Sequence, residues 1–248
     1  HSVLLTPAWQ LVNPGETREG TPSPVGRVLV LASGTAADAA RSIYPEARIL
    51  EALPDEPESI LSDIDHVVWI APDTSLAQLT DEDLIDAQAR GVLQAFAAIR
   101  HLIDAGQGSK PIRWTFVTTQ AQAVDAGERP NPMHAAVLGL AGSLAKEYPV
   151  WPVRAIDLPC GWSRGEAQGV SLQDADALPF DPVGATWARR DGQWYRQFLV
   201  PSDDLANPAP DDIDASSYKR HGVYVVVGGA GGIGEAWTAY MIRTYQAR

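Results

Sequence analysis

The sequence predicts an α/β fold: a Rossmann-like parallel sheet closed by a hairpin, followed by the first βα unit of a second Rossmann fold. Three observations predict it. Apolar runs of strand length alternate with helical patterns, which is typical of βαβ units. Two later apolar runs are joined by Asp191 and Gly192, the turn chemistry of a hairpin. Near the end, the apolar residues 223–227 lead into five glycines within seven residues, 228–234.

The predicted strands of the first lobe are continuous apolar runs, suited to burial on both faces of a sheet. Residues 1–13 form a short apolar segment, and residues 14–24, rich in Pro, Gly and Ser, form a loop. The strands cover residues 27–32, 48–50, 67–71, 113–118 and 153–157. From their pattern we expect a core that includes Val28, Val30, Val68, Ile70, Val117 and Ile156.

Three helices are predicted between these strands. The first covers residues 36–43 and consists mostly of small residues. The strongest covers residues 81–104, because Thr80 and Asp83 form a capping box and apolar residues return on one face. The third covers residues 133–148 and is stopped by Pro149.

The pattern changes after the third helix, which indicates a domain boundary. Residues 185–189 and 194–200 are the strands of the closing hairpin, and residues 201–217 are acidic and contain proline. We therefore predict a structural lobe at residues 1–200, a linker at 201–217 and the start of a second subdomain at 218–248.

Composition excludes several classes of function. The 248 residues allow one large domain or two smaller ones, and a net charge of −12 argues against nucleic acid or a membrane as partner. A single cysteine, Cys160, excludes an internal disulfide, and the scattered histidines predict no metal site. There is no membrane-spanning run or signal peptide, so we expect a cytoplasmic protein. Because the first residue is His1 rather than Met, we expect a piece of a longer polypeptide.

The glycine cluster is the candidate cofactor site. Glycine lets a backbone turn sharply and approach phosphates, while the N-terminus of the following helix offers free N–H groups to them. The alternative is a purely structural glycine turn, but the preceding strand and following helix favour dinucleotide binding. The predicted cofactor-binding residues are Gly228, Gly229, Ala230, Gly231, Gly232, Ile233 and Gly234.

The first βα turn lacks this pattern. If Gly34 is matched to Gly228, the positions four and six residues later are Asp38 and Ala40, where the last motif has glycines. A Cβ at a position of close approach would collide with a pyrophosphate, and a carboxylate would repel it. We therefore predict that the first lobe binds no nucleotide.

The motifs together resemble a known family. Residues 223–235 resemble the start of the catalytic subdomain of polyketide synthase ketoreductases, which belong to the short-chain dehydrogenase superfamily. Residues 116–124, 136–141, 143–149 and 153–158 are similar to the structural subdomain of these enzymes, and 188–193 to its closing strands. Residues 235–245 resemble the trans-acyltransferase branch of these synthases.

The resemblance implies NADPH as cofactor and the β-keto group of a polyketide intermediate on an acyl carrier protein as substrate. It also implies a catalytic tyrosine assisted by serine, lysine and asparagine, but the chain has no Tyr-x-x-x-Lys or Tyr-x-x-x-Asn. No catalytic residue is therefore assigned, and we expect them beyond Arg248. Thr118, Thr119 and His134 fall roughly where the serine and tyrosine of the superfamily would lie, and we interpret them as a vestige.

Two hypotheses of different class follow. The first is part of an NADPH-dependent ketoreductase, inactive as this fragment alone, with a carrier protein and neighbouring synthase domains as partners. The second is a non-catalytic scaffold, a truncated or pseudo-ketoreductase that positions neighbouring domains. A free-standing dehydrogenase is disfavoured because little of the sequence follows the glycine motif.

Overall fold

The computed structural model describes residues 5–13, 26–54, 56–73, 81–167, 169–201 and 218–248. The chain divides into two compact units, residues 7–199 in one and residues 1–6 with 200–248 in the other. The first unit, which we call the first lobe, and the C-terminal segment 218–248 are described separately below.

One sheet organises the first lobe, and among the described residues it has eight strands in the order β1-β8-β7-β6-β5-β4-β2-β3. The strands from β2 to β7 pair in parallel, and β8 runs antiparallel to β7. The strand bounds are β1 Leu5–Val12, β2 Val28–Leu31, β3 Arg48–Leu50, β4 His66–Ile70, β5 Arg113–Thr119, β6 Val153–Leu158, β7 Thr186–Arg190 and β8 Gln193–Pro201. This confirms the predicted Rossmann-like sheet with a closing hairpin.

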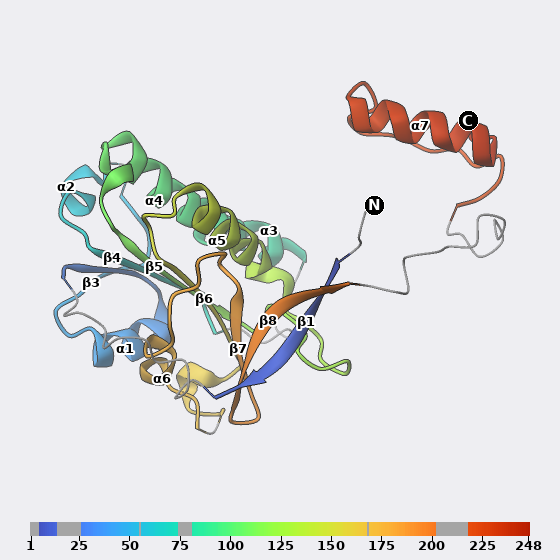
Figure 1. The fold of residues 1–248 in the computed structure, drawn as a ribbon. Coiled ribbons are helices and arrows are strands. Elements are labelled where there is room, and N and C mark those ends of the chain that lie inside the picture. The colour runs from blue at the N-terminus through green and yellow to red at the C-terminus, as the bar shows by residue number, and fades with distance from the viewer. Residues whose placement is uncertain (1–4, 14–25, 55, 74–80, 168, 202–217) are drawn as a thin grey trace. The chain divides into compact units, whose positions relative to one another are not determined.

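Helices cover both faces of the sheet, which explains why its central strands are apolar throughout. Figure 1 shows α3, α4 and α5 on one face and α1 and α6 on the other. The helix bounds are α1 Gly34–Ile43, α2 Glu58–Leu61, α3 Asp81–Arg90, α4 Val92–Asp104, α5 Ala135–Glu147 and α6 Leu172–Asp176. Each face has its own hydrophobic cluster, and the six predicted core residues are confirmed as buried in the cluster beneath α1.

The order of the strands reverses at β2, because β3 lies on one side of it and β4 on the other. In open α/β sheets, ligands bind in the crevice outside the carboxyl ends of the strands at such a reversal. The corresponding place in this lobe is the space beyond the ends of β2 and β4.

The prediction of one long helix at residues 81–104 is wrong in one respect: the structure has two helices, α3 and α4, separated at Gly91. Gly91 has φ −93° and ψ −120°, which no helix allows. The indole nitrogen of Trp69 donates to the carbonyl of Arg90 at 3.2 Å, so this last carbonyl of α3 has a partner outside the helix. The predicted capping residue Thr80 lies outside the described residues.

The hairpin prediction is confirmed. Arg190 pairs with Gln193, which leaves Asp191 and Gly192 as the two turn residues. Both have positive φ, 47° and 72°, as the tight hairpin turn requires. The sequence did not predict α2, or that residues 5–12 form the edge strand β1 beside β8.

The C-terminal segment contains one helix among its described residues, α7, Gly232–Tyr245. Aromatic rings from both ends of the segment pack edge to face, with Tyr218 5.5 Å from Tyr245 and 6.0 Å from Trp237. Tyr224 adds contacts to Tyr218 and Trp237 at 6.0 and 6.1 Å. These contacts hold residues 218–224 against α7.

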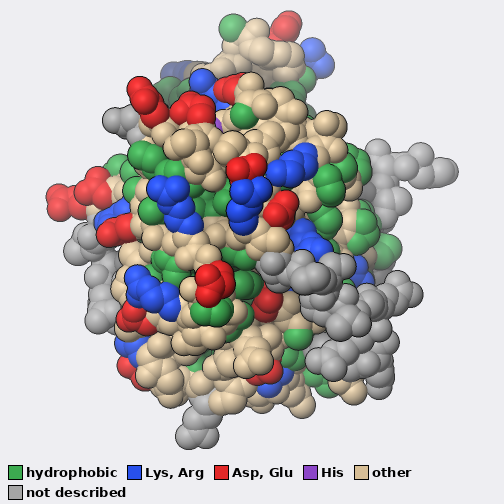
Figure 2. Space-filling view, turned by 90° about the vertical axis from the view of Figure 1, so that its left-hand side faces the viewer, with side chains coloured by type: hydrophobic (Ala, Val, Ile, Leu, Met, Phe, Trp, Pro, Cys, Tyr) green, Lys and Arg blue, Asp and Glu red, His purple; other side chains and the backbone are tan. Residues whose placement is uncertain are grey.

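The surface of the chain carries both signs of charge. Lys, Arg, Asp and Glu side chains are interspersed over the face shown in Figure 2. Exposed ion pairs such as that of Arg41 with Asp38 also occur on the surface. Within the described residues, no helix has the length and apolarity to cross a membrane, and no group of His, Cys, Asp or Glu could hold a metal ion.

Candidate cofactor-binding site

The predicted cofactor-binding residues form a tight turn that ends at the N-terminus of α7. Gly228 begins the turn with φ +83°, a left-handed conformation that side chains rarely adopt. The amide of Gly231 donates to the carbonyl of Gly228 at 3.0 Å and closes the turn. Gly231 is extended and caps the helix, and Gly232 begins it. The structure thus brings residues 228–234 together, as the sequence predicts.

The glycines of the turn meet two different requirements. A Cβ added to Gly234 would lie 2.7 Å from Cα of Gly229, so the packing of the turn itself demands glycine there. A Cβ added to Gly232 would meet no other atom within 4 Å. Packing among the described residues therefore does not require glycine at position 232. It leaves one side of the turn clear, which fits the close approach of a bulky ligand to the backbone.

The helix end provides the complementary charge. The first N–H to bond within α7 is that of Glu235, which donates to the carbonyl of Gly231 at 2.8 Å. The N–H groups of residues 232–234 precede this bond and have no acceptor inside the helix. They lie at the positive end of the helix dipole, which favours an anion such as a pyrophosphate. The residues present therefore fit a dinucleotide.

The buried strand predicted at residues 223–227 is wrong. These residues belong to no strand, and Val223, Val225 and Val227 are 79%, 92% and 98% exposed. Tyr224 and Val226 are half-buried, so burial alternates along the segment as it does in an extended chain. A strand requires a hydrogen-bonded neighbour. Among the described residues, the backbone amide of Tyr224 donates to the carbonyl of Arg248, and this contact does not make a strand pair.

The structure does not bring the proposed vestigial residues together. Thr118 donates to the carboxylate of Asp157 at 2.6 Å, whereas Thr119 accepts from the indole of Trp162 at 3.2 Å. His134 packs edge-on against Trp69, with ring centroids 5.4 Å apart. Trp69 and Trp162 belong to the clusters on opposite faces of the sheet, so Thr119 and His134 are separated by it.

His134 is buried, and neither ring nitrogen has a hydrogen-bond partner in the structure. Burial, with a smaller contribution from the positive charge of Arg90, lowers the pKa of His134 to about 4. The ring is therefore neutral at pH 7. Among the residues that the structure describes, it is packed in the core against Trp69 and faces no group that could exchange a proton with it for catalysis.

An ion-pair network that the sequence analysis missed closes the carboxyl end of the sheet beside Thr118. Asp157 has a fully buried side chain, and its carboxylate accepts from Thr118, from the amide of Ala121 at 2.8 Å and from Arg190 at 2.7 Å. Arg190 also bonds Glu128 at 2.7 Å. The available signal was a charged residue in each of two predicted strand regions: Asp157 in the apolar run of β6, and Arg190 at the end of β7 directly after the run 185–189.

The fold and the glycine turn together define the class: a Rossmann-like α/β lobe and a glycine-rich turn that opens a helix. No protein-family model matches the chain. Over 254 residues it is 35% identical to polyketide synthase PksN of Bacillus subtilis (strain 168), and over 261 residues it is 36% identical to PksM of the same organism. Both matches cover 100% of the chain, which spans only 4% and 6% of these synthases.

Solved structures show the same fold. An N-terminal ketoreductase from the macrolactin assembly line aligns with 99% of the chain at a TM-score of 0.57 and 12% identity, over 51% of its own length. A ketoreductase domain from the bacillaene assembly line aligns with 97% of the chain at a TM-score of 0.55 and 14% identity, over 46% of its length. The chain belongs to the polyketide synthases, as a segment with the fold of their ketoreductase domains.

Proposed function

We propose that this chain is the structural lobe and the beginning of the NADPH-binding subdomain of a polyketide synthase ketoreductase. The complete domain would reduce the β-keto group of a polyketide intermediate, tethered to an acyl carrier protein, to a hydroxyl. Bound NADPH supplies the hydride for such a reduction. The observation that carries the proposal is the turn at residues 228–234, with its open side at Gly232 and its free N–H groups at α7.

The chain's residues have defined tasks in this proposal. Gly228 provides the left-handed turn, and the contact between Gly234 and Gly229 keeps α7 close to the preceding segment. The N–H groups at the start of α7 bind the pyrophosphate. Under this proposal residues 1–200 are the structural subdomain, residues 201–217 are the linker and residues 218–248 begin the cofactor subdomain.

The proton donor and its helpers lie elsewhere in the polypeptide under this proposal. The chain aligns with 46% and 51% of the two solved ketoreductases, so about half of such a domain is outside it. Within the first lobe, Thr118 is bonded to Asp157 and His134 is enclosed by the core, so neither can protonate a substrate. The 248 residues alone are therefore expected to show no turnover.

The test is a substitution at Gly232 in the complete ketoreductase-containing protein. Gly232→Val should weaken NADPH binding by about 100-fold or more, on the order of 2.7 kcal/mol, because the side chain fills the space that the phosphates approach. The measurement is the Kd from the fluorescence of bound NADPH, repeated with NADH to establish which cofactor is preferred. Gly139→Val is the matched control, since Gly139 lies on α5 in the first lobe and a Cβ there is equally unobstructed.

An unchanged NADPH Kd in Gly232→Val, with the control also unchanged, would contradict the cofactor role and leave a structural turn. The second candidate function, a non-catalytic scaffold, is favoured by the closed carboxyl end of the first lobe around Asp157 and Arg190. A β-ketoacyl thioester assay of the complete protein separates the two. Reduction to the alcohol supports the ketoreductase, and NADPH binding without reduction supports the scaffold.

A further inference from the structure

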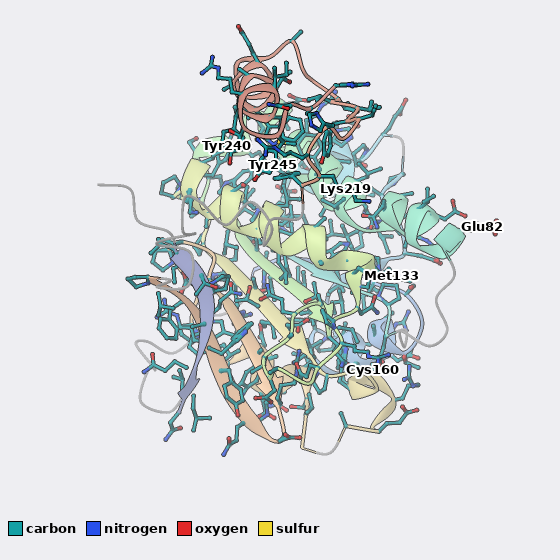
Figure 3. The ribbon with its side chains drawn as sticks, turned by 90° about the vertical axis from the view of Figure 1, so that its right-hand side faces the viewer. Glu82, Met133, Cys160, Lys219, Tyr240 and Tyr245 are labelled. Atoms are coloured by element: carbon teal, nitrogen blue, oxygen red, sulfur yellow. The ribbon has the colours of Figure 1, made fainter. Side chains whose placement is uncertain are left out.

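The crevice beyond β2 and β4 is filled by the chain itself, by residues 159–166, which we call the crevice loop. The loop follows β6, and Cys160, labelled in Figure 3, lies near its start beside α1. Trp162 is 4% exposed and belongs to the hydrophobic cluster that contains the buried alanines of α1. Its indole nitrogen donates to Thr119 at the end of β5 at 3.2 Å. The loop thus bridges α1 and the end of the sheet.

The loop also touches the first turn of α1. The hydroxyl oxygens of Thr35 and Ser163 lie 2.7 Å apart. In a nucleotide-binding lobe, this helix end faces the phosphates. Here Ser163 lies against it.

Asp73 anchors the loop from the other side of the crevice. It follows β4 closely, and its side chain is only 1% exposed. One carboxylate oxygen accepts from the amide of Gly161 at 2.8 Å. The other accepts from the amide and the hydroxyl of Ser163 at 3.1 and 2.9 Å, and the guanidinium of Arg164 lies 3.5 Å from it. The backbone N–H groups of Gly161 and Ser163 thus converge on one negative charge, as N–H groups do around a bound anion.

Asp38, whose charge led us to predict that the first lobe binds no nucleotide, does not face this crevice. Asp38 has a side chain that is 73% exposed and paired with Arg41 at 2.5 Å. Ala40 is buried in the core. The crevice loop, and not the charge of Asp38, occupies the space.

We propose that Asp73 is a positioning residue that acts as an internal anion and holds the crevice loop in the ligand crevice of the first lobe. The carboxylate satisfies the N–H groups of Gly161 and Ser163, and this keeps Ser163 against Thr35 and Trp162 in the core. The ligand crevice of the first lobe is thus occupied by the crevice loop, which the carboxylate of Asp73 holds in place. This inference is independent of the cofactor role of residues 228–234.

Amide hydrogen exchange of the full 248-residue chain, resolved by NMR, tests the proposal. Asp73→Ala should accelerate exchange at Gly161 and Ser163 at least about tenfold, because local opening becomes easier once their acceptors are removed. Amides of the sheet, such as that of Val68, should keep their rates. Asp38→Ala is the control, since it removes an exposed carboxylate from α1 and should leave both loop amides unchanged.

Unchanged exchange at Gly161 and Ser163 in Asp73→Ala would overturn the proposal, and so would equal acceleration at Val68, which would indicate general destabilisation. If Asp73→Ala does not fold, Ser163→Ala replaces it, because it removes only the hydroxyl that bonds Asp73 and Thr35. A smaller acceleration confined to the loop supports the proposal, and no acceleration there refutes it.

Discussion

Replacing Arg190 by methionine should cost the first lobe about 3–5 kcal/mol of its free energy of unfolding. Arg190 is 4% exposed and makes five hydrogen bonds, two of them to Asp157 and the others to Glu128, Gln122 and Arg189. The substitution keeps most of the volume and removes the positive charge. Asp157 would then be a fully buried carboxylate without a counter-ion, and uncompensated buried charges have costs of this size.

The measurement is equilibrium unfolding in urea, with circular dichroism as the signal. Domains of this size have unfolding free energies of roughly 5–15 kcal/mol, so the expected loss is a large shift of the midpoint. Arg41→Met is the matched control, because Arg41 pairs with Asp38 on the surface, where such a pair contributes about 1 kcal/mol or less. Adding Asp157→Asn to Arg190→Met should restore part of the loss by removing the unpaired charge. A loss in Arg190→Met no larger than that of the control would refute the reasoning.

Two further predictions concern the core. Burial lowers the pKa of His66 to about 3 and the pKa of His134 to about 4, whereas both are about 6.5 in the unfolded chain. Below pH 6.5 the unfolded chain therefore binds more protons than the folded chain. The free energy of unfolding, measured by urea titration, should therefore fall by about 4 kcal/mol between pH 7 and pH 5. His134→Phe should remove about half of this pH dependence. A urea midpoint that does not change with pH would contradict the lowered pKa values of the two histidines. Gly184→Ala should cost roughly 1–3 kcal/mol in the same assay, because φ is +68° and the new Cβ would lie 2.8 Å from Cα of Gly142. Gly139→Ala, at an open helical position, should gain up to about 1 kcal/mol instead, and equal effects at the two glycines would rule out the steric cause.

The sheet could be predicted from the sequence because each central strand carries its own signal. Val28, Val68 and Val117 lie in runs that are apolar on both faces, and only a sheet covered on both sides buries such runs. The hairpin was equally local, since Asp191 and Gly192 adopt the positive φ values that their residue types favour. For such elements, neighbouring residues contain most of the information.

The misjudged elements depend on contacts that are distant in sequence. Gly91 interrupts a helical pattern, and the interruption fits the structure because the ring of His134 lies where a Cβ on residue 91 would be. The segment around Val225 has the composition of a strand, but pairing decides whether a strand forms. Asp73 lies 88 residues from Gly161, so no local pattern could connect them.

The candidate cofactor site also has features that the sequence predicts and features that only the structure reveals. The positions of Gly228 and Gly234 follow from a motif, and the structure supplies a backbone reason for each. That Gly232 faces open space, whereas Gly234 does not, could be learned only from the three-dimensional turn. The sequence led us to expect no nucleotide in the first lobe from Asp38 and Ala40, and this stays a prediction. The contact between Asp73 and Gly161 formed no part of that reasoning.

The uncovered valines at 223, 225 and 227 have a consequence for any experiment that uses this chain in isolation. An extended, valine-rich and exposed segment that belongs to no strand is a template for intermolecular strand pairing and aggregation. Self-association should then increase with protein concentration, and an amyloid-type dye should report it before the first lobe unfolds. Val225→Lys should reduce this association, because a charge within such a segment opposes strand pairing.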